Sequence, residues 1–144
     1  MTTVRNILQS KGSDIWSIAP DTLVFDALKV LSEKNIGALL VVESDRLVGI
    51  FSERDYARKV ALKGETSHNI AVRNIMTPEP VFVTPDQTIE NCMALMSDKH
   101  IRHLPVLENN KLIGMISIGD VVKAVISEHV DTIKQLENYI TGKR

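Results

Sequence analysis

The apolar and polar positions of the chain follow two periods, and the same order of periods occurs twice. In each half, four apolar residues recur at i, i+3, i+4 and i+7, which predicts a helix with one buried face. They are Val24, Ala27, Leu28 and Leu31 in the first half and Ile89, Cys92, Met93 and Met96 in the second. Two apolar runs separated by a polar turn follow each helix, "ALLVVE" and "LVGIFS" first, then "HLPVLE" and "LIGMIS", and they predict hairpins.

Short apolar segments precede both predicted helices, at 15–18 and 81–83, and we expect each to be a strand. Each segment meets a Pro-Asp pair, which we interpret as a helix start with the aspartate near the N-cap.

The two halves are copies of one unit. Residues 18–60 align with 83–125 without a gap, and 13 of the 43 pairs are identical, where chance would give roughly three. Upstream, "VRNI" at 4–7 recurs at 72–75, so the first copy carries three extra residues, which we place in a loop. A repeat of this kind indicates that the fold contains two copies of one structural unit.

Each copy is a β-α-β-β-α unit whose second helix we expect to start at Asp55 or Asp120. One unit leaves an apolar sheet face uncovered, so two units packed by pseudo-twofold symmetry would cover each other. The predicted fold class is α/β (α+β). Residues 1–65 and 66–126 form the two repeats, and 127–144 form a C-terminal helical extension.

The motif Gly-x-x-Ser-x-x-Asp lies at the end of the second hairpin strand in both copies, as "GIFSERD" and "GMISIGD". A single aspartate there is more often a helix cap than a ligand contact. Its duplication favours a binding role, because a carboxylate held by a helix N-terminus can accept two hydrogen bonds from adjacent hydroxyl groups. Serine at the same helix start can orient a phosphate or a group near the base.

The composition of the chain argues against several classes of protein and partner. The net charge of −1 over 144 residues argues against duplex nucleic acid as the main partner. A single cysteine excludes an intramolecular disulfide and multi-cysteine zinc sites. No apolar run approaches 18 residues and the N-terminus has no apolar signal region, so we expect a cytoplasmic protein without a membrane partner.

The segments "NIGALLVVESDRLVGIFSERD" and "IRHLPVLENNKLIGMISIGD" resemble the cystathionine-β-synthase (CBS) domain, here as a tandem pair, or Bateman module. The resemblance covers roughly residues 4–126 and implies a stand-alone CBS pair. It also implies adenosine ligands (AMP, ADP, ATP or NAD, sometimes S-adenosylmethionine), bound in two clefts between the repeats. No required cofactor and no metal site are expected.

The resemblance also implies a set of binding residues for each cleft. The first cleft would combine Ser52, Arg54 and Asp55 with Thr77, Pro80, Val81, Arg102, His103 and Leu104. The second would combine Met115, Ser117 and Asp120 with Lys11, Ile15, Trp16, Gly37, Ala38 and Leu39. The apolar strand ends, Ile50 and Val81 in the first cleft and Met115 and Trp16 in the second, would sandwich an adenine.

The two clefts differ in charge. The first has Arg54, Arg102 and His103 to meet phosphate, whereas the second has only Lys11, so we hypothesise that the first binds phosphate more strongly. The family often has His-Arg where this chain has Arg102-His103, so which of the two points into the cleft stays open. Trp16 either flanks an adenine or packs between the repeats.

Catalytic and metal-binding alternatives are weaker. Ser117, Asp120 and His103 have no nucleophile elbow around them, so we predict no catalytic residue. Cys92, Met93 and Met96 match Ala27, Leu28 and Leu31 of the first copy, which indicates a core face and not a soft-metal site.

A heptad-like stripe continues past the repeats, at Val122, Ile126, His129, Ile133, Leu136 and Ile140. It predicts a long helix whose apolar face needs a partner. The partner is either the chain's own core or N-terminal helix, at 4–9, or the same helix of a second chain. The resemblance favours a homodimer, because CBS pairs commonly form disc-like homodimers.

The sequence therefore predicts a regulatory adenine-nucleotide sensor that is not an enzyme. We expect it to signal to a downstream protein, whose identity the sequence does not give. The alternative is a structural or protein-interaction CBS pair without ligand.

Overall fold

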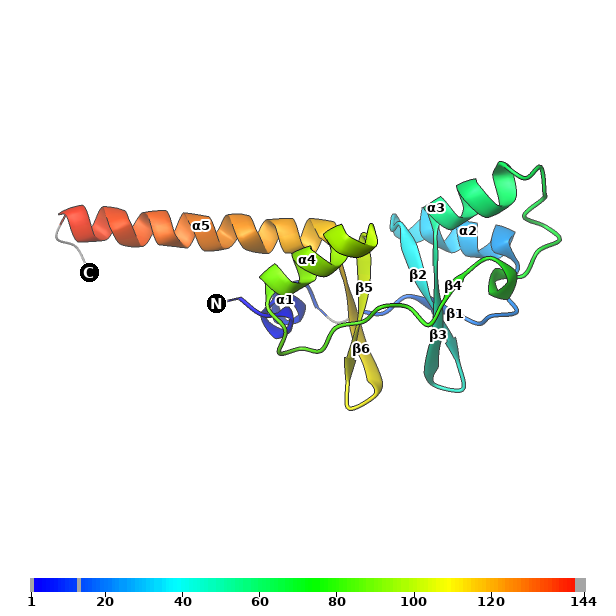
Figure 1. Cartoon of the computed structure of the whole chain (residues 1–144), viewed down its shortest axis with the longest axis horizontal. Coiled ribbons are helices and arrows are strands. Elements are labelled where there is room, and N and C mark those ends of the chain that lie inside the picture. Colours follow the sequence, from blue (N-terminus) through cyan, green and yellow to red (C-terminus); the bar gives the residue numbers. More distant parts are fainter. Residues whose placement is uncertain (1, 13, 142–144) are drawn as a thin grey trace.

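The computed structural model describes residues 2–12 and 14–141, and Figure 1 shows two similar units side by side. The first unit contains β1 (Ser17–Ile18), α2 (Val24–Lys34), β2 (Ala38–Glu43), β3 (Arg46–Ser52), α3 (Glu53–Tyr56) and a π-helical turn at Ala57–Ala61. The second contains α4 (Ile89–Lys99), β5 (His103–Glu108), β6 (Lys111–Ser117) and α5 (Ile118–Thr141). The helix α1 (Val4–Lys11) precedes both, and a 3₁₀ turn (Val72–Asn74) with β4 (Thr77–Pro78) links them.

The two hairpins are confirmed and share one register. Ala38 pairs with Ser52 in β2–β3, and the equivalent His103 pairs with Ser117 in β5–β6. Both two-residue turns, Ser44-Asp45 and Asn109-Asn110, have positive φ throughout. That geometry matches the twist of antiparallel strands and suits asparagine and aspartate.

The short strands before the helices are only partly confirmed. In the first unit, β1 pairs in parallel with β2 over two residues. In the second, the predicted strand 81–83 is reduced to one parallel bridge between Val83 and Val106. The first sheet therefore runs β1-β2-β3-β4, whereas the second has the two strands β5-β6.

The helix N-caps lie two residues beyond the aspartates of the predicted Pro-Asp starts. The N-caps are Leu23 and Thr88, because the backbone at both positions is held extended by bridges to neighbouring segments, Leu23 to Ala71 and Thr88 to Thr3. Met93 is also misassigned to the core, since 42% of its surface is exposed, whereas Cys92 is fully buried.

The two "VRNI" segments are exchanged between the units. Val4 N–H donates to the Gln87 carbonyl at 2.9 Å, and Val72 N–H donates to the Thr22 carbonyl at 2.8 Å. Val4 is buried in the second unit's core, whose other members include Ile7, Leu8, Val83, Ile89, Cys92, Leu104, Ile116 and Val121. Val72 is buried in the first unit's core, with Val24, Ala27, Leu31, Leu39, Phe51, Val60 and Ile75. The core of the second unit is therefore completed by the segment at the start of the chain, and the core of the first unit by the segment between the two units.

The motif glycines make room for these exchanged segments. A Cβ on Gly49 would lie 2.9 Å from Met76 Cγ and 3.0 Å from the Thr77 carbonyl oxygen. A Cβ on Gly114 would lie 2.7 Å from Leu8 Cδ2, at the equivalent place in the other unit. Such distances are too short for carbon atoms, so close packing explains both glycines.

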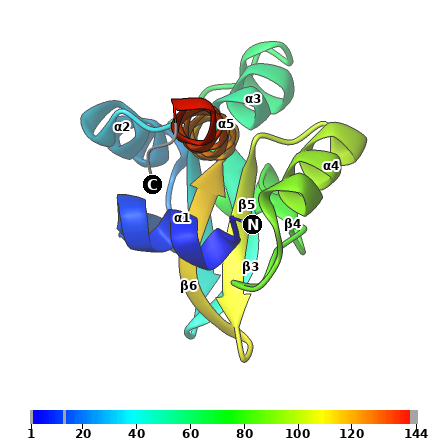
Figure 2. The ribbon, with the colours of Figure 1, turned by 90° about the vertical axis from the view of Figure 1, so that its left-hand side faces the viewer.

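The predicted long helix is confirmed as α5, which runs from the second unit into solvent (Figure 1). Its first turns pack against α1, α4 and β6, and Figure 2 shows α1 and α4 on either side of it. The extension predicted to reach residue 144 is described to Thr141, and 142–144 lie outside the described residues.

Candidate ligand cleft between the two repeats

The helix after β3 begins with a capping box that fixes Asp55. Ser52 Oγ accepts a hydrogen bond from Asp55 N–H at 3.2 Å, and Asp55 Oδ2 accepts one from Ser52 N–H at 2.9 Å. The predicted start at Asp55 is thus two residues late, because Ser52 is the N-cap and Asp55 is the third residue of the helix. Lys59, one turn on, lies 3.2 Å from Asp55 Oδ1. The Asp55 carboxylate is mostly buried, at 8% residue exposure, and held in one orientation.

Asp120 repeats this arrangement at the start of α5, with a different cation. Asp120 Oδ2 accepts from Ser117 N–H at 2.8 Å and from Lys11 Nζ at 2.7 Å. Lys11 also donates to the Met115 carbonyl at 2.9 Å. Burial raises the pKa of Asp120, but Lys11 and the Ser117 N–H outweigh it, and the pKa lies below its ordinary value. The N-terminal helix therefore places its last residue on the carboxylate of the second motif.

A cavity of about 380 Å³ opens at Asp55, between the two units. It takes residues from β3 and α3 of the first unit, from the segment 77–81, and from the segment that precedes β5. Its lining is Gly37, Ile50, Ser52, Glu53, Arg54, Asp55, Thr77, Glu79, Pro80, Val81, His100, Ile101, Arg102 and His103. Arg54 spans it, because its guanidinium donates to the His100 carbonyl of the second unit at 3.2 Å. The volume is within the range of small-molecule pockets.

The structure brings together nearly all the residues predicted for the first cleft. The members that line the cavity are Ser52, Arg54, Asp55, Thr77, Pro80, Val81, Arg102 and His103. Leu104 does not line it, because its side chain is fully buried in the core of the second unit. Both Arg102 and His103 reach the cavity, so the order of the pair does not turn either one away.

The residues predicted for the second cleft are less well assembled. Lys11, Met115, Ser117 and Asp120 lie together through the contacts above. Gly37 instead lines the Asp55 cavity, while Ala38 and Leu39 are fully buried.

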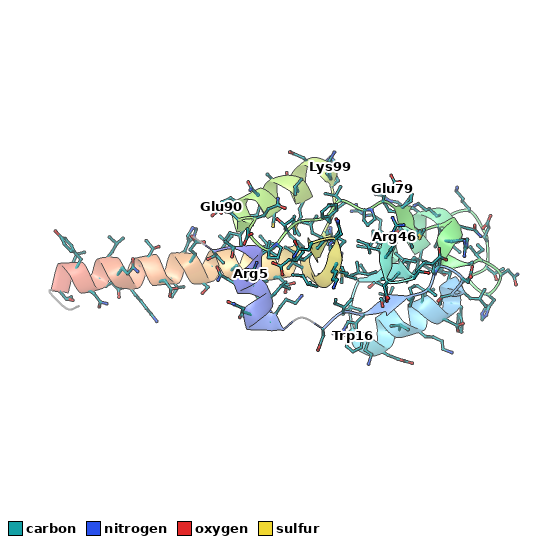
Figure 3. The ribbon with its side chains drawn as sticks, turned by 90° about the horizontal axis from the view of Figure 1, so that it is seen from below. Arg5, Trp16, Arg46, Glu79, Glu90 and Lys99 are labelled. Carbon is teal, nitrogen blue, oxygen red and sulfur yellow. The ribbon has the colours of Figure 1, made fainter. Side chains whose placement is uncertain are left out.

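Trp16 and Ile15 are the remaining members of the second set. The Lys34 ammonium lies 4.3 Å from the centre of the Trp16 ring, a contact within the first unit, and 39% of Trp16 is exposed. Ile15 is half-buried. Trp16 and Glu79, which lines the Asp55 cavity, lie at opposite edges of the molecule in Figure 3.

Four lining residues were missed by the sequence analysis: Glu53, Glu79, His100 and Ile101. Glu53 lies between Ser52 and Arg54 in the motif, so its position in the sequence could have predicted that it lines the cavity. Glu79 and His100 have positive φ, 46° and 55°, which turns the chain at the edge of the cavity. The two glutamates offset part of the positive charge that Arg54 and Arg102 supply.

His103 lies beside both motifs. Its Cε1 would be 3.5 Å from a Cβ on Gly37, and its charged neighbours are Asp120, Lys11 and Arg102. Burial lowers the pKa of His103, and the nearby cations lower it further against the opposing effect of Asp120. His103 is therefore neutral at pH 7 and can donate or accept a hydrogen bond without adding charge.

The core interpretation of Cys92 is confirmed. Its side chain is fully buried, and burial raises the pKa of the thiol to about 11. Among residues 2–12 and 14–141, no group of three or more His, Cys, Asp or Glu side chains could hold a metal ion.

The CBS domain family model matches the chain twice, over residues 4–62 and 72–127. The Arabidopsis thaliana protein "CBS domain-containing protein CBSX3, mitochondrial" is 42% identical over 98% of this chain and 73% of its own length. Because that relative is described as mitochondrial, similarity does not support the expected cytoplasmic location. No helix in the described part of the chain is long and apolar enough to cross a membrane.

Solved structures agree with the fold. A candidate signal-transduction protein with CBS domains from Burkholderia ambifaria is 50% identical, with a TM-score of 0.85, covering 88% of this chain and 95% of that one. The CBS domain pair of the protein MJ0100, solved with 5′-methylthioadenosine and S-adenosyl-L-methionine, has a TM-score of 0.78 at 22% identity. That match covers 89% of this chain and 98% of that one.

Proposed function

This chain belongs to the CBS domain family as a tandem pair of CBS domains, and from that premise we propose that it is a regulatory sensor of an adenosine-containing ligand. The observation that carries the proposal is the cavity at Asp55, which gathers polar and apolar residues from both repeats. A ligand there would contact both units at once and change how they pack. The more distant MJ0100 pair, which binds adenosine compounds, supports the ligand class.

The chemistry of the cavity suits a nucleoside better than a free anion. Asp55 offers a fixed carboxylate to a ribose diol, and each charge-assisted hydrogen bond contributes roughly 1.5–3 kcal/mol. Ile50 and Val81 offer apolar surface to the flat base. Arg54 and Arg102 can meet phosphate, whereas Glu53 and Glu79 disfavour it. AMP, ADP, ATP, NAD and S-adenosylmethionine all carry the adenosine that this chemistry would recognise, and they differ in the charge that the two arginines and two glutamates would meet.

We place the ligand in the Asp55 cavity rather than at Asp120. Asp120 Oδ2 already receives the Lys11 ammonium and the Ser117 N–H, so a ribose would have to displace an ion pair. Asp55 also has a lysine partner, but Lys59 belongs to the same helix and lies farther away, at 3.2 Å. This difference supports the unequal clefts that the charge pattern predicts.

One observation favours the alternative, a structural or protein-interaction pair without ligand. Both motif carboxylates have hydrogen-bond partners within the chain, and among the described residues no buried side-chain nitrogen or oxygen lacks one. The cleft is thus chemically satisfied when empty, as a purely structural pair would require.

Ligand binding to matched variants tests the proposal. We expect AMP, ADP, ATP, NAD or S-adenosylmethionine to raise the melting temperature of the protein, since a ligand at 100 times its Kd adds about 2.7 kcal/mol of stability. Asp55→Asn should abolish the shift, and Asp120→Asn, in the equivalent capping box, should retain it.

No shift with any of the five compounds would support the structural alternative. Loss of the shift in Asp120→Asn alone would move the site to the other cleft. Turnover of a nucleotide would contradict a purely regulatory role.

We also infer that the chain self-associates and that a downstream protein detects the ligand-bound form. A CBS-CP12 protein from cyanobacteria that is 30% identical to this chain is described as hexameric, which supports assembly in relatives. A homodimer is the simplest such assembly.

A further inference from the structure

The outer part of α5 carries apolar side chains that no other described part of the chain covers. Residues 129–141 are all exposed, and Figure 3 shows their side chains clear of every other segment. Ile133, Leu136 and Ile140 are 54%, 58% and 81% exposed. The chain's own core takes Val121, Ala124 and Val125 from this helix, and none of these belongs to the stripe. The inner stripe residues Val122 and Ile126 are 47% and 57% exposed, so the core does not cover the stripe.

The exposed side chains form one face. Ile126, Ile133 and Ile140 occupy one heptad position, and Val122, His129 and Leu136 occupy the other. Val130 and Tyr139, 44% and 86% exposed, flank this seam. A face this regular and this long, about 27 Å from Val122 to Ile140 at 1.5 Å per residue, is typical of a coiled coil.

We propose that this face binds the α5 helix of a second copy of the chain in antiparallel orientation. Each layer of the seam then joins unlike positions around a twofold axis at Asp131. The layers are Val122 with the partner's Ile140, Ile126 with the partner's Leu136, and His129 with the partner's Ile133, each formed twice.

Charge complementarity selects this orientation. In the antiparallel pair, Lys123 lies opposite the partner's Glu137 and Glu137 lies opposite the partner's Lys123, so two ion pairs line one side of the seam. Between them, Val130 faces its own copy across the axis. In a parallel pair, Lys123 would face Ile118 and Glu137 would face Thr132, and His129 would face His129 in the centre of the seam.

The shape of the molecule also favours antiparallel packing. α1 and α4 lie on either side of the base of α5 (Figure 2), so a parallel partner would bring a second body to the same crowded end. In the antiparallel pair, Val125 and the partner's Val125 lie about 18 Å apart along the axis, by the same rise per residue. Only the slim end of the partner helix then has to fit beside α1 and α4.

This inference deepens the self-association proposed above and does not depend on the ligand. Full-length protein should be a dimer in sedimentation equilibrium at micromolar concentration. Ile133→Asp should leave a folded monomer, because Ile133 is 54% exposed and belongs to neither of the two cores. Its circular dichroism and its ligand-induced melting shift should stay those of the wild type.

Charge exchange tests the orientation. Lys123→Glu and Glu137→Lys should each raise the dimer dissociation constant about tenfold, since each reversal turns two attractive pairs into two repulsive ones. The double variant should return to the wild-type value. Lys134→Glu, off the seam, serves as the control and should change little.

Four other outcomes would each overturn a different part of the proposal. A monomeric wild type overturns both this inference and the self-association above. A dimer that survives Ile133→Asp overturns this surface alone, and single reversals without rescue in the double variant overturn the antiparallel orientation. An α5 face that binds an added amphipathic helix but not a second copy would overturn the choice of occupant.

Discussion

At the scale of single residues, the motif Gly-x-x-Ser-x-x-Asp combines three separate requirements. Gly49 makes room for Met76 and Thr77, Ser52 caps a helix, and Asp55 completes the capping box and lines the cavity. The helix-cap interpretation and the ligand interpretation of the aspartate therefore do not exclude each other. A carboxylate already fixed by its own helix loses little further freedom when a ligand binds.

The first prediction concerns the glycines. Gly49→Ala should lower the free energy of unfolding by about 1–3 kcal/mol, because a Cβ would meet Met76 and the Thr77 carbonyl. Gly119→Ala is the control, since its Cβ would be 3.6 Å from Ser117 Oγ in a helix. That variant should be neutral or more stable by up to about 1 kcal/mol. Urea unfolding of both variants checks this, and equal effects would contradict the packing argument.

At the scale of elements, the hairpins, the main helix faces and the long helix could be predicted, because each depends on a local period or a local turn. The helix starts could not, since Leu23 and Thr88 are held by partners distant in sequence. The exchange of the two "VRNI" segments was equally hidden, because the two segments have the same sequence and so carry no signal for one core over the other.

The residues of the candidate site also fall into those that a local pattern could predict and those that it could not. Ser52, Arg54 and Asp55 of the duplicated motif line the Asp55 cavity, while Glu79 and His100 enter it through backbone turns that have no local signature. The contact between Lys11 and Asp120 joins chain segments 109 positions apart, and only the resemblance to the CBS domain placed the two residues in one cleft.

The Lys11–Asp120 pair predicts a pH dependence. The folded-state pKa of Asp120 lies below the ordinary value of about 4, so its contribution to stability is present above that value and is lost as pH falls through the lowered pKa. Lys11→Met should lower stability at pH 7 and should make the loss between pH 5 and pH 3 shallower.

Chemical unfolding at pH 7, 5, 4 and 3 measures this effect. Lys29→Met is the matched control, because Lys29 lies 4.0 Å from Asp26 in an exposed pair on one helix and should change the pH profile little. An unchanged acid slope in Lys11→Met would show that the pair does not hold the carboxyl in its charged form.

At the scale of the whole molecule, duplication has produced two motifs but unequal surroundings. The Asp55 side opens into a cavity between the units, and the Asp120 side is occupied by the end of α1. Similar sequences thus give one motif beside an open cavity and one whose carboxylate is held by the end of α1.

This asymmetry predicts the stoichiometry. Wild-type protein should bind one ligand per chain in calorimetry, and Lys11→Ala should add a second, weaker site by releasing Asp120. Lys11→Arg, which keeps the positive charge, should stay at one. Two equal sites in the wild type would contradict the role given to Lys11.

The exchanged segments also have a consequence for the order of synthesis. Residues 72–76 complete the first core about twenty residues after β3 is made, so that unit can close while the rest of the chain is still on the ribosome. Val4 must wait for Val121, a member of the same core. At 5–20 residues per second, that wait is roughly ten seconds. Val4 is therefore made well before the later members of its core, and it stays exposed to solvent for that interval.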